Sequence, residues 1–161
     1  MRPSAAFSRL LLAAAMVCCL ASCSIGYQSE WRRAAALEST TKPTNLDGAW
    51  EGTWRSIASG HTGRLKAVAT SEPAAKGRPV KYHFHYYATW AKVLSGTIHA
   101  DHSAKPKGKG KPGAVDLTGE KDLGRLGGVY SFTGTATPTE FKADYKGGMD
   151  HGVFEMQRPV K

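Results

Sequence analysis

The chain has 161 residues, 41% of them hydrophobic and 22% charged, which is enough apolar side chain for one compact core and excludes a disordered chain. Its 22 Lys and Arg against 13 Asp and Glu give a formal net charge of +9, which favours anionic surfaces as partners. All three cysteines fall within the first 23 residues, so neither a disulfide framework nor a cysteine-based metal knuckle holds the fold.

The N-terminal segment has the three parts of a secretory signal. Two arginines supply positive charge, an apolar stretch runs over residues 10–20, and small residues follow at positions 21 and 22. The apolar stretch is too short to persist comfortably as a membrane-spanning helix. We therefore expect residues 1–22 to be a signal peptide that is absent from the mature protein.

The residues at the expected cleavage site, Leu20-Ala21-Ser22-Cys23, resemble the bacterial lipobox. In that motif the cysteine is diacylated on its sulfur before cleavage in front of it. The resemblance implies that Cys23 is the lipid attachment site and that the protein is anchored to a membrane of the cell envelope, in the periplasm or on the outer surface. Two or three acyl chains on one residue hold a protein far more firmly than one. The alternative is an ordinary signal peptide that is cut elsewhere and leaves a free thiol.

Residues 23–46 differ in character from the rest of the chain. They contain a short helical patch around Trp31 to Glu38, followed by a polar run of Ser, Thr, Lys, Pro and Asn. We interpret this segment as a lipid-anchored linker between the membrane and the domain. From residue 47 to residue 161 apolar residues recur at every second position, which is the period of a β-strand.

The β region divides into about eight short alternating runs separated by clusters of turn residues. We expect strands at residues 50–55, 65–69, 80–90, 94–101, 114–119, 129–136, 141–145 and 152–158. No amphipathic helix intervenes, so the expected fold is all-β: an antiparallel meander that closes into a small barrel or forms a compact sandwich.

A lysine-rich segment at residues 103–113 interrupts this pattern. Its lysines are separated by Pro or Gly, so we expect a mobile loop that builds neither ladder nor core. Four of them could contact an anionic envelope surface: Lys105, Lys107, Lys109 and Lys111. The alternative is a solvated loop that keeps the protein soluble.

Both ends of the β region resemble the calycins, the lipocalin and avidin class of barrel. Gly48-Ala49-Trp50 resembles the Gly-x-Trp of their first strand, and Gly52-Thr53-Trp54 fits equally well. Arg158 stands at the end of the last strand, where calycins place a basic residue over that tryptophan. The resemblance implies a barrel that binds or stores small apolar molecules.

Strand parity directs ten aromatic side chains to one interior. An ordinary core explains them without a ligand, yet four are tyrosines, whose hydroxyls need partners when buried. We therefore expect an interior that is partly polar and open at one mouth, with Arg158 stacked on Trp50 at the opposite end. The candidate ligand-binding residues are Trp50, Trp54, Tyr82, Tyr86, Tyr130, Tyr145 and Arg158.

The sequence has no motif of a known catalytic or nucleotide-binding site, so we expect no enzyme, no cofactor and no nucleic-acid partner. Four side chains on the outward face of two paired strands could ligate zinc or copper: His83, His85, His99 and Asp101. We interpret them as solvated and assign no metal site. Asp150 and Gly152 flank the start of the last strand, as a turn requires.

Three functions are compatible with the sequence. The domain binds a small apolar or amphipathic molecule, or it is a structural or surface-docking envelope lipoprotein without a ligand, or it binds a metal through its surface histidines. An interior filled by its own side chains would favour the structural role, and a tyrosine-lined cavity would favour binding.

Overall fold

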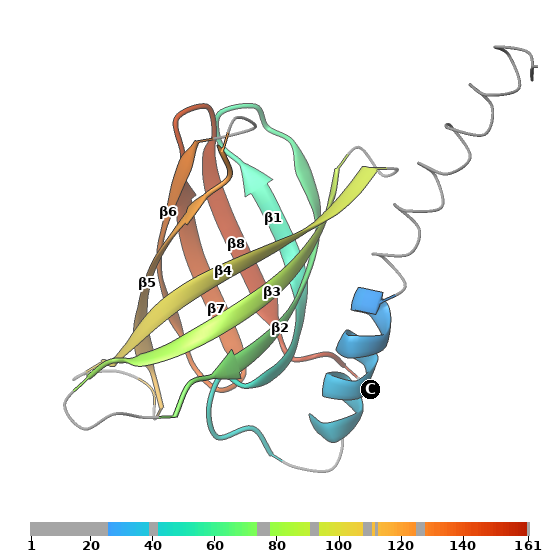
Figure 1. Ribbon diagram of the computed structural model, residues 1–161, viewed down its shortest axis with the longest axis vertical. Coiled ribbons are helices and arrows are strands. Elements are labelled where there is room, and N and C mark those ends of the chain that lie inside the picture. Colours follow the sequence, from blue (N-terminus) through green and yellow to red (C-terminus); the bar gives the residue numbers. More distant parts are fainter. Residues whose placement is uncertain are drawn as a thin grey trace, which may run out of the picture.

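A computed structural model describes residues 26–38, 42–73, 78–90, 94–107, 111, 113–124 and 128–160, so Cys23 and the expected signal peptide lie outside the described residues. Eight antiparallel strands follow one another around a closed barrel, in which the first strand pairs with the last (Figure 1). The strands are β1 (Gly48–Ser56), β2 (Thr62–Ser71), β3 (Val80–Trp90), β4 (Leu94–Pro106), β5 (Val115–Asp122), β6 (Val129–Ala136), β7 (Glu140–Lys146) and β8 (His151–Gln157). The all-β meander and its closure are confirmed, and the sandwich alternative is excluded.

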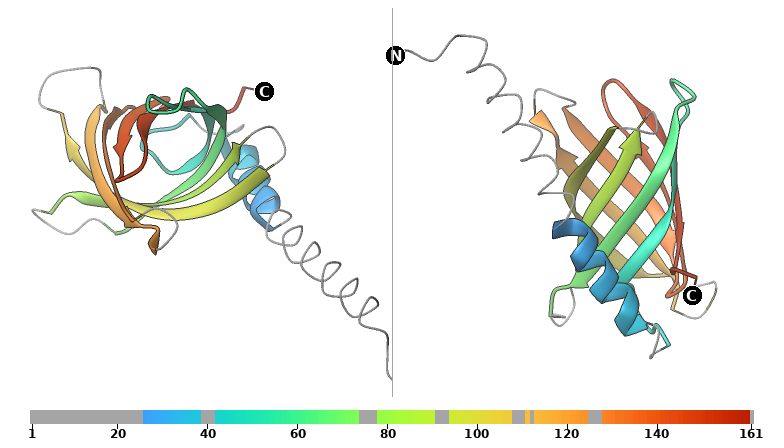
Figure 2. Two further views of the ribbon diagram at one scale, coloured as in Figure 1. Left: turned by 90° about the horizontal axis from the view of Figure 1, so that it is seen from above. Right: turned by 90° about the vertical axis from the view of Figure 1, so that its right-hand side faces the viewer.

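The period of two places one face of every strand inside the ring, which the left view of Figure 2 looks into. Across the seam that closes the barrel, Trp54 of β1 stands opposite Phe154 of β8. On the other side of β1, Trp50 stands opposite Ala67 of β2. Large side chains therefore lie beside both large and small ones on the inner wall, and the predicted parity is correct.

The meander gives the barrel two different ends. Strands β1, β3, β5 and β7 finish at one end of the barrel, which we call the open end. Strands β2, β4, β6 and β8 finish at the other end, where β1 begins (Figure 1). We call this second end the closed end, because a tryptophan and an arginine cover it.

Trp50 and Arg158 form the cover of the closed end. The guanidinium of Arg158 lies 4.0 Å from the centre of the Trp50 ring, so the predicted stacking is confirmed. Trp50 is fully buried and its Nε1 donates to the carbonyl of Leu46 at 2.9 Å. Arg158 also donates to Glu38 at 2.6 Å, and the two side chains are only 10% and 15% exposed. The pKa of Glu38 is nevertheless raised, because burial outweighs the attraction of the guanidinium.

The helix at residues 26–38 packs on the outside of the barrel, across β2 and β3 (Figure 2, right). Tyr27 is only 1% exposed and stacks on Tyr87 of β3 at 5.1 Å between ring centres. Trp31 donates from Nε1 to the backbone carbonyl of Trp50 at 3.0 Å. The helix thus starts earlier than the predicted patch, and this part of the expected linker is in contact with the domain. Within the described part of the chain, no helix is both long enough and apolar enough to cross a bilayer.

The expectation that residues 103–113 build neither ladder nor core is wrong for the first part of that segment. β4 continues to Pro106, and residues 103–106 pair with residues 115–118 of β5. Ala104 continues the inward parity of the strand and is 2% exposed, while Lys105 points outward into solvent. Lysine is therefore compatible with the strand here, because the alternation keeps its charge outside.

Candidate functional site

The interior of the barrel is an aromatic cluster. All ten aromatic side chains that parity directed inward belong to the buried core or pack against it. Rings meet in a continuous series, with centre-to-centre distances of 4.8 Å between Tyr145 and Phe154 and 5.9 Å between Phe154 and Phe132. Such contacts add to the free energy gained from burial alone.

A cavity of about 150 Å³ remains inside the open end. Its wall includes four of the seven candidate ligand-binding residues: Trp54, Tyr86, Tyr130 and Tyr145. Six apolar side chains complete most of the wall: Leu65, Ala88, Ile98, Leu123, Phe132 and Phe154. The cavity is thus mainly apolar, as small-molecule sites usually are.

Two glycines of the β7–β8 region make room for the tyrosines of this wall. A Cβ atom on Gly147 would lie 2.6 Å from the ring of Tyr130. A Cβ atom on Gly152 would lie 2.7 Å from the hydroxyl of Tyr145. Because real Cβ atoms do not approach so closely, a larger residue at Gly147 would displace Tyr130 from the cavity wall. At Gly152 it would also clash with the backbone carbonyl of Arg55 on the paired strand β1.

A carboxylate stands at the mouth of the cavity. Asp150 lines it and accepts hydrogen bonds from the Ser56 hydroxyl at 2.6 Å and from the Tyr145 hydroxyl at 3.0 Å. Ser56 is itself 1% exposed and accepts a hydrogen bond from the backbone N–H of Ser59 at 2.9 Å. Burial and the hydrogen bond with Asp150 raise the pKa of Tyr145. The network ties the end of β1 to the turn between β7 and β8.

The turn predicted at Asp150 is present, since the backbone N–H of Gly147 donates to the Asp150 carbonyl at 2.8 Å. Its contact with Ser56 does not follow from a turn motif. Ser56 and Asp150 are 94 positions apart, and only closure of the barrel brings the two side chains together. The one feature of the sequence that could have indicated a role for Ser56 is its place as a polar residue at the end of an otherwise alternating strand.

The sequence pattern also misses a histidine inside the barrel. His102 is 1% exposed, and its Nε2 lies 3.0 Å from the hydroxyl of Tyr86. Its ring sits 4.8 Å from Phe84 and 5.5 Å from Phe132, measured between ring centres. Among the described residues its Nδ1 has no hydrogen-bond partner. Burial lowers its pKa to about 4, so the imidazole is neutral at pH 7. The predicted strand ends at Asp101. Because Ala100 faces inward, continuing the alternation by two residues would have placed His102 inside the barrel.

The other three candidate ligand-binding residues lie away from the cavity, at the closed end. Trp50 and Arg158 form the cover described above. Tyr82 is 6% exposed, and its ring centre is 6.4 Å from that of Phe84. The structure therefore divides the seven candidates into four that line the cavity and three that close the far end.

The outward-facing histidines interact mainly with carboxylates. His83 lies 2.6 Å from Asp101 and 3.0 Å from Glu72, and the hydrogen bond with Asp101 raises its pKa. His85 lies 2.8 Å from Glu30 of the helix, and its ring stacks on His99 at 3.9 Å. No group of three or more His, Cys, Asp or Glu side chains in the described part of the chain is arranged to hold a metal ion.

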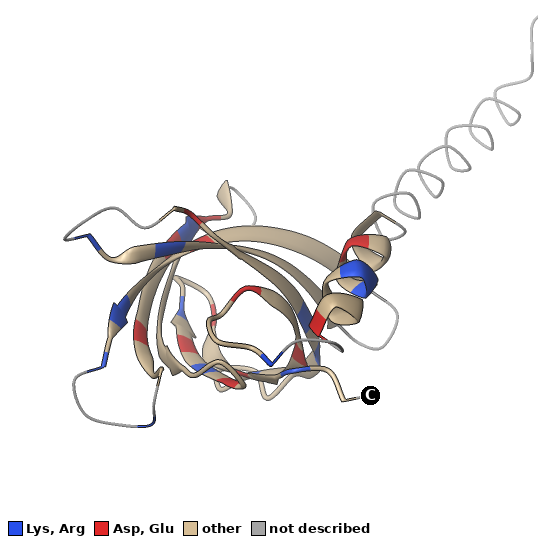
Figure 3. Cartoon of the chain, turned by 90° about the horizontal axis from the view of Figure 1, so that it is seen from below, with Lys and Arg blue, Asp and Glu red and all other residues tan. Residues whose placement is uncertain are grey.

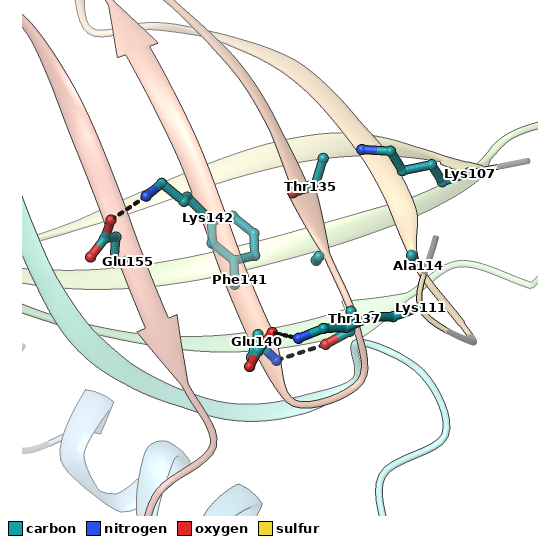
Figure 4. Close-up of a pocket in the computed structure, with 10 residues that line it drawn as sticks. Lys107, Lys111, Ala114, Thr135, Thr137, Glu140, Phe141, Lys142 and Glu155 are labelled. Carbon is teal, nitrogen blue, oxygen red and sulfur yellow. Dashed lines mark hydrogen bonds and ion pairs between the residues drawn. The ribbon is translucent and has the colours of Figure 1, made fainter. Parts of the chain in front are cut away.

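A larger hollow of about 490 Å³ lies on the outside near the closed end (Figure 4). Four of its five charged side chains pair with one another, Lys111 with Glu140 and Lys142 with Glu155, both at 2.6 Å. Positions of both charge signs are also interspersed along the strands of the barrel (Figure 3). This hollow is open and polar, and these two cations already have partners, so it is a weaker candidate for a small-molecule site than the interior cavity.

The four lysines proposed for an anionic surface are only partly described. Lys105 is exposed on β4, and Lys107 lies 3.6 Å from Asp116 of β5. Lys111 forms the pair with Glu140, and Lys109 lies outside the described residues. Contact with an anionic surface through this segment stays a prediction.

Neither a protein-family model, nor a curated protein, nor a solved structure matches this chain. The architecture itself, eight antiparallel strands in a closed meander, is consistent with a calycin-like fold.

Proposed function

We propose that this domain is a non-enzymatic binding protein for a small apolar or amphipathic molecule, held in the cavity at the open end. One observation carries the proposal: the interior of the barrel is not completely filled, and the space left is lined by aromatic and aliphatic side chains with a few polar groups at its mouth. A few convergent polar groups on an apolar wall are the usual composition of a ligand site.

The size of the cavity limits the ligand. An apolar cavity on the order of 150 Å³ accommodates a molecule such as benzene, and the cavity here measures about 150 Å³. One six-membered ring with one or two further heavy atoms therefore matches it. A long acyl chain does not fit unless the barrel rearranges.

Titration calorimetry with benzyl alcohol tests this function. Binding is expected to the wild-type protein and to be lost in Ala88→Leu, because Ala88 lines the cavity and the larger side chain fills it. Thr97→Leu is the matched control, since it places the same side chain on the exposed outward face of β4. No heat of binding to the wild type, or equal affinity in both variants, would contradict the proposal.

The proposed location is the bacterial cell envelope, with Cys23 as the lipid anchor. The lipobox-like residues support it, as does the excess of basic residues, which suits anionic envelope surfaces. Cells fed radioactive palmitate should label the wild-type protein and a Cys18→Ser control, but not Cys23→Ser. Label retained at the wild-type level in Cys23→Ser would overturn the anchor.

A further inference from the structure

Asp150 is the one charged side chain among the described residues that line the interior cavity. Its two carboxylate oxygens take hydrogen bonds from hydroxyl groups, those of Ser56 and Tyr145. No Lys, Arg or His of the described residues forms an ion pair with it. A carboxylate accepts about four hydrogen bonds in all, so its capacity is only partly used. The mouth of an apolar cavity thus holds a negative charge for which the described chain supplies no counter-ion.

Aromatic rings surround the same space. Tyr145 stacks with Phe154 at 4.8 Å and lies 6.2 Å from Tyr130, measured between ring centres. Trp54 lines the cavity from β1. The faces of such rings attract cations through their quadrupole, most strongly where water is excluded. Tyr130 also lines the cavity, and a tyrosine hydroxyl can accept a hydrogen bond from an N–H group.

The charge of Asp150 reaches into the cavity wall. Burial and, after it, the negative charge of Asp150 raise the pKa of Tyr130, and the same carboxylate contributes to the raised pKa of Tyr145. Among the described residues, no basic side chain lines the cavity to receive an anion. The interior of this end is therefore negative, although the chain as a whole has a formal net charge of +9.

From this arrangement we infer that the cavity selects a small organic cation, an ammonium group attached to an apolar ring or short chain. The inference rests on the proposed function and adds the chemical class of the ligand. The apolar part fills the aromatic cavity, while the ammonium lies at the mouth and donates to the free acceptor positions of Asp150 and to the Tyr130 hydroxyl. An alternative is that Asp150 only fastens the β7–β8 turn to Ser56.

Three probes that share one ring and differ in charge separate these possibilities. They are benzylamine, which is protonated at pH 7, benzyl alcohol, which is neutral, and benzoate, which is an anion. In calorimetry on the wild-type protein at low salt, benzylamine is expected to bind roughly tenfold more tightly than benzyl alcohol, and benzoate more weakly than either. This series needs no substitution, so it decides between them even if a variant at position 150 does not fold.

The variant Asp150→Asn tests whether the carboxylate causes the preference for benzylamine over benzyl alcohol. The variant is expected to lose the advantage of benzylamine over benzyl alcohol. Asp144→Asn is the matched control, because Asp144 is exposed on the outward face of β7, and it should keep the full preference. Equal binding of benzylamine and benzyl alcohol by the wild type, or a preference that survives in Asp150→Asn, would overturn this inference and leave the proposed function intact. If none of the three probes binds, the proposed function fails and the inference fails with it.

Discussion

The substitution His102→Gln is expected to make the barrel more resistant to acid. His102 is buried among aromatic rings, and burial holds its pKa at about 4 against 6.5 for an exposed histidine. Gln has similar length and can still reach the hydroxyl of Tyr86, but it does not titrate. Loss of the titrating group is therefore the main change.

The direction and size of this effect on the free energy of unfolding follow from the different proton affinities of His102 in the folded and unfolded states. Between pH 6.5 and pH 4 the unfolded chain binds a proton at His102 that the folded barrel excludes, so acidification favours unfolding. The gap between the two pKa values corresponds to about 3 kcal/mol once the pH is below both, and about 2 kcal/mol of it is expressed by pH 5. The wild type should lose this amount of unfolding free energy between pH 7.5 and pH 5, relative to His102→Gln.

Urea unfolding of both proteins at pH 7.5 and pH 5 measures the difference. His83→Gln is the control, since the hydrogen bond with Asp101 raises the pKa of this exposed histidine and gives the opposite sign. A raised pKa stabilises the folded state at low pH and loses that effect as the pH rises, so His83→Gln should increase acid sensitivity. Equal pH dependence in the wild type and His102→Gln would refute the burial of a neutral imidazole.

Three further substitutions test the packing of the barrel and its helix. Trp50→Ala should lower the free energy of unfolding in urea by about 3–5 kcal/mol, because it removes a fully buried indole and leaves a cavity at the closed end. A loss below about 1 kcal/mol would show that the indole is not part of the core. Glu38→Ala leaves the Arg158 guanidinium without its counter-charge and should cost about 3–5 kcal/mol in the same assay. Glu38→Gln should cost less because it keeps a hydrogen bond, and equal losses would argue against a charge effect. Tyr27→Ala should raise amide exchange in helix 26–38 and leave the strands protected, and unchanged exchange there would contradict the docking of the helix.

The number, order and facing of the strands could be predicted because one face of each strand is buried and the other is wet. The alternation can be recognised without knowing which strands pair. It places side chains that are far apart in the sequence, such as Trp50 and Phe154, in the same interior. The end of β4 is harder to predict, because Pro and Gly near the lysines favour an early end of the strand. Ala104, inward and buried, shows that parity is the better guide there.

The polar parts of the site depend on contacts that parity does not report. Asp150 has the sequence context of a turn residue, and its contact with Ser56 exists only after β1 and β8 pair. The division of the aromatic candidates between cavity and closed end depends on how far along the barrel each lies, which is set by the stagger of the strands. Docking of Tyr27 on β3 depends on the path of the helix outside the barrel, which has no signature in the strand pattern.

The position of a bound small molecule is the most direct measure of whether the barrel is a binding protein. Intermolecular nuclear Overhauser effects can be recorded between the ring protons of benzyl alcohol and the methyl groups of the protein. If the interior cavity is the binding site, signals are expected to Leu65, Ala88 and Ile98, which line the cavity at the open end. Signals confined to methyl groups outside the cavity, such as those of the exposed Val129, would contradict binding inside the barrel.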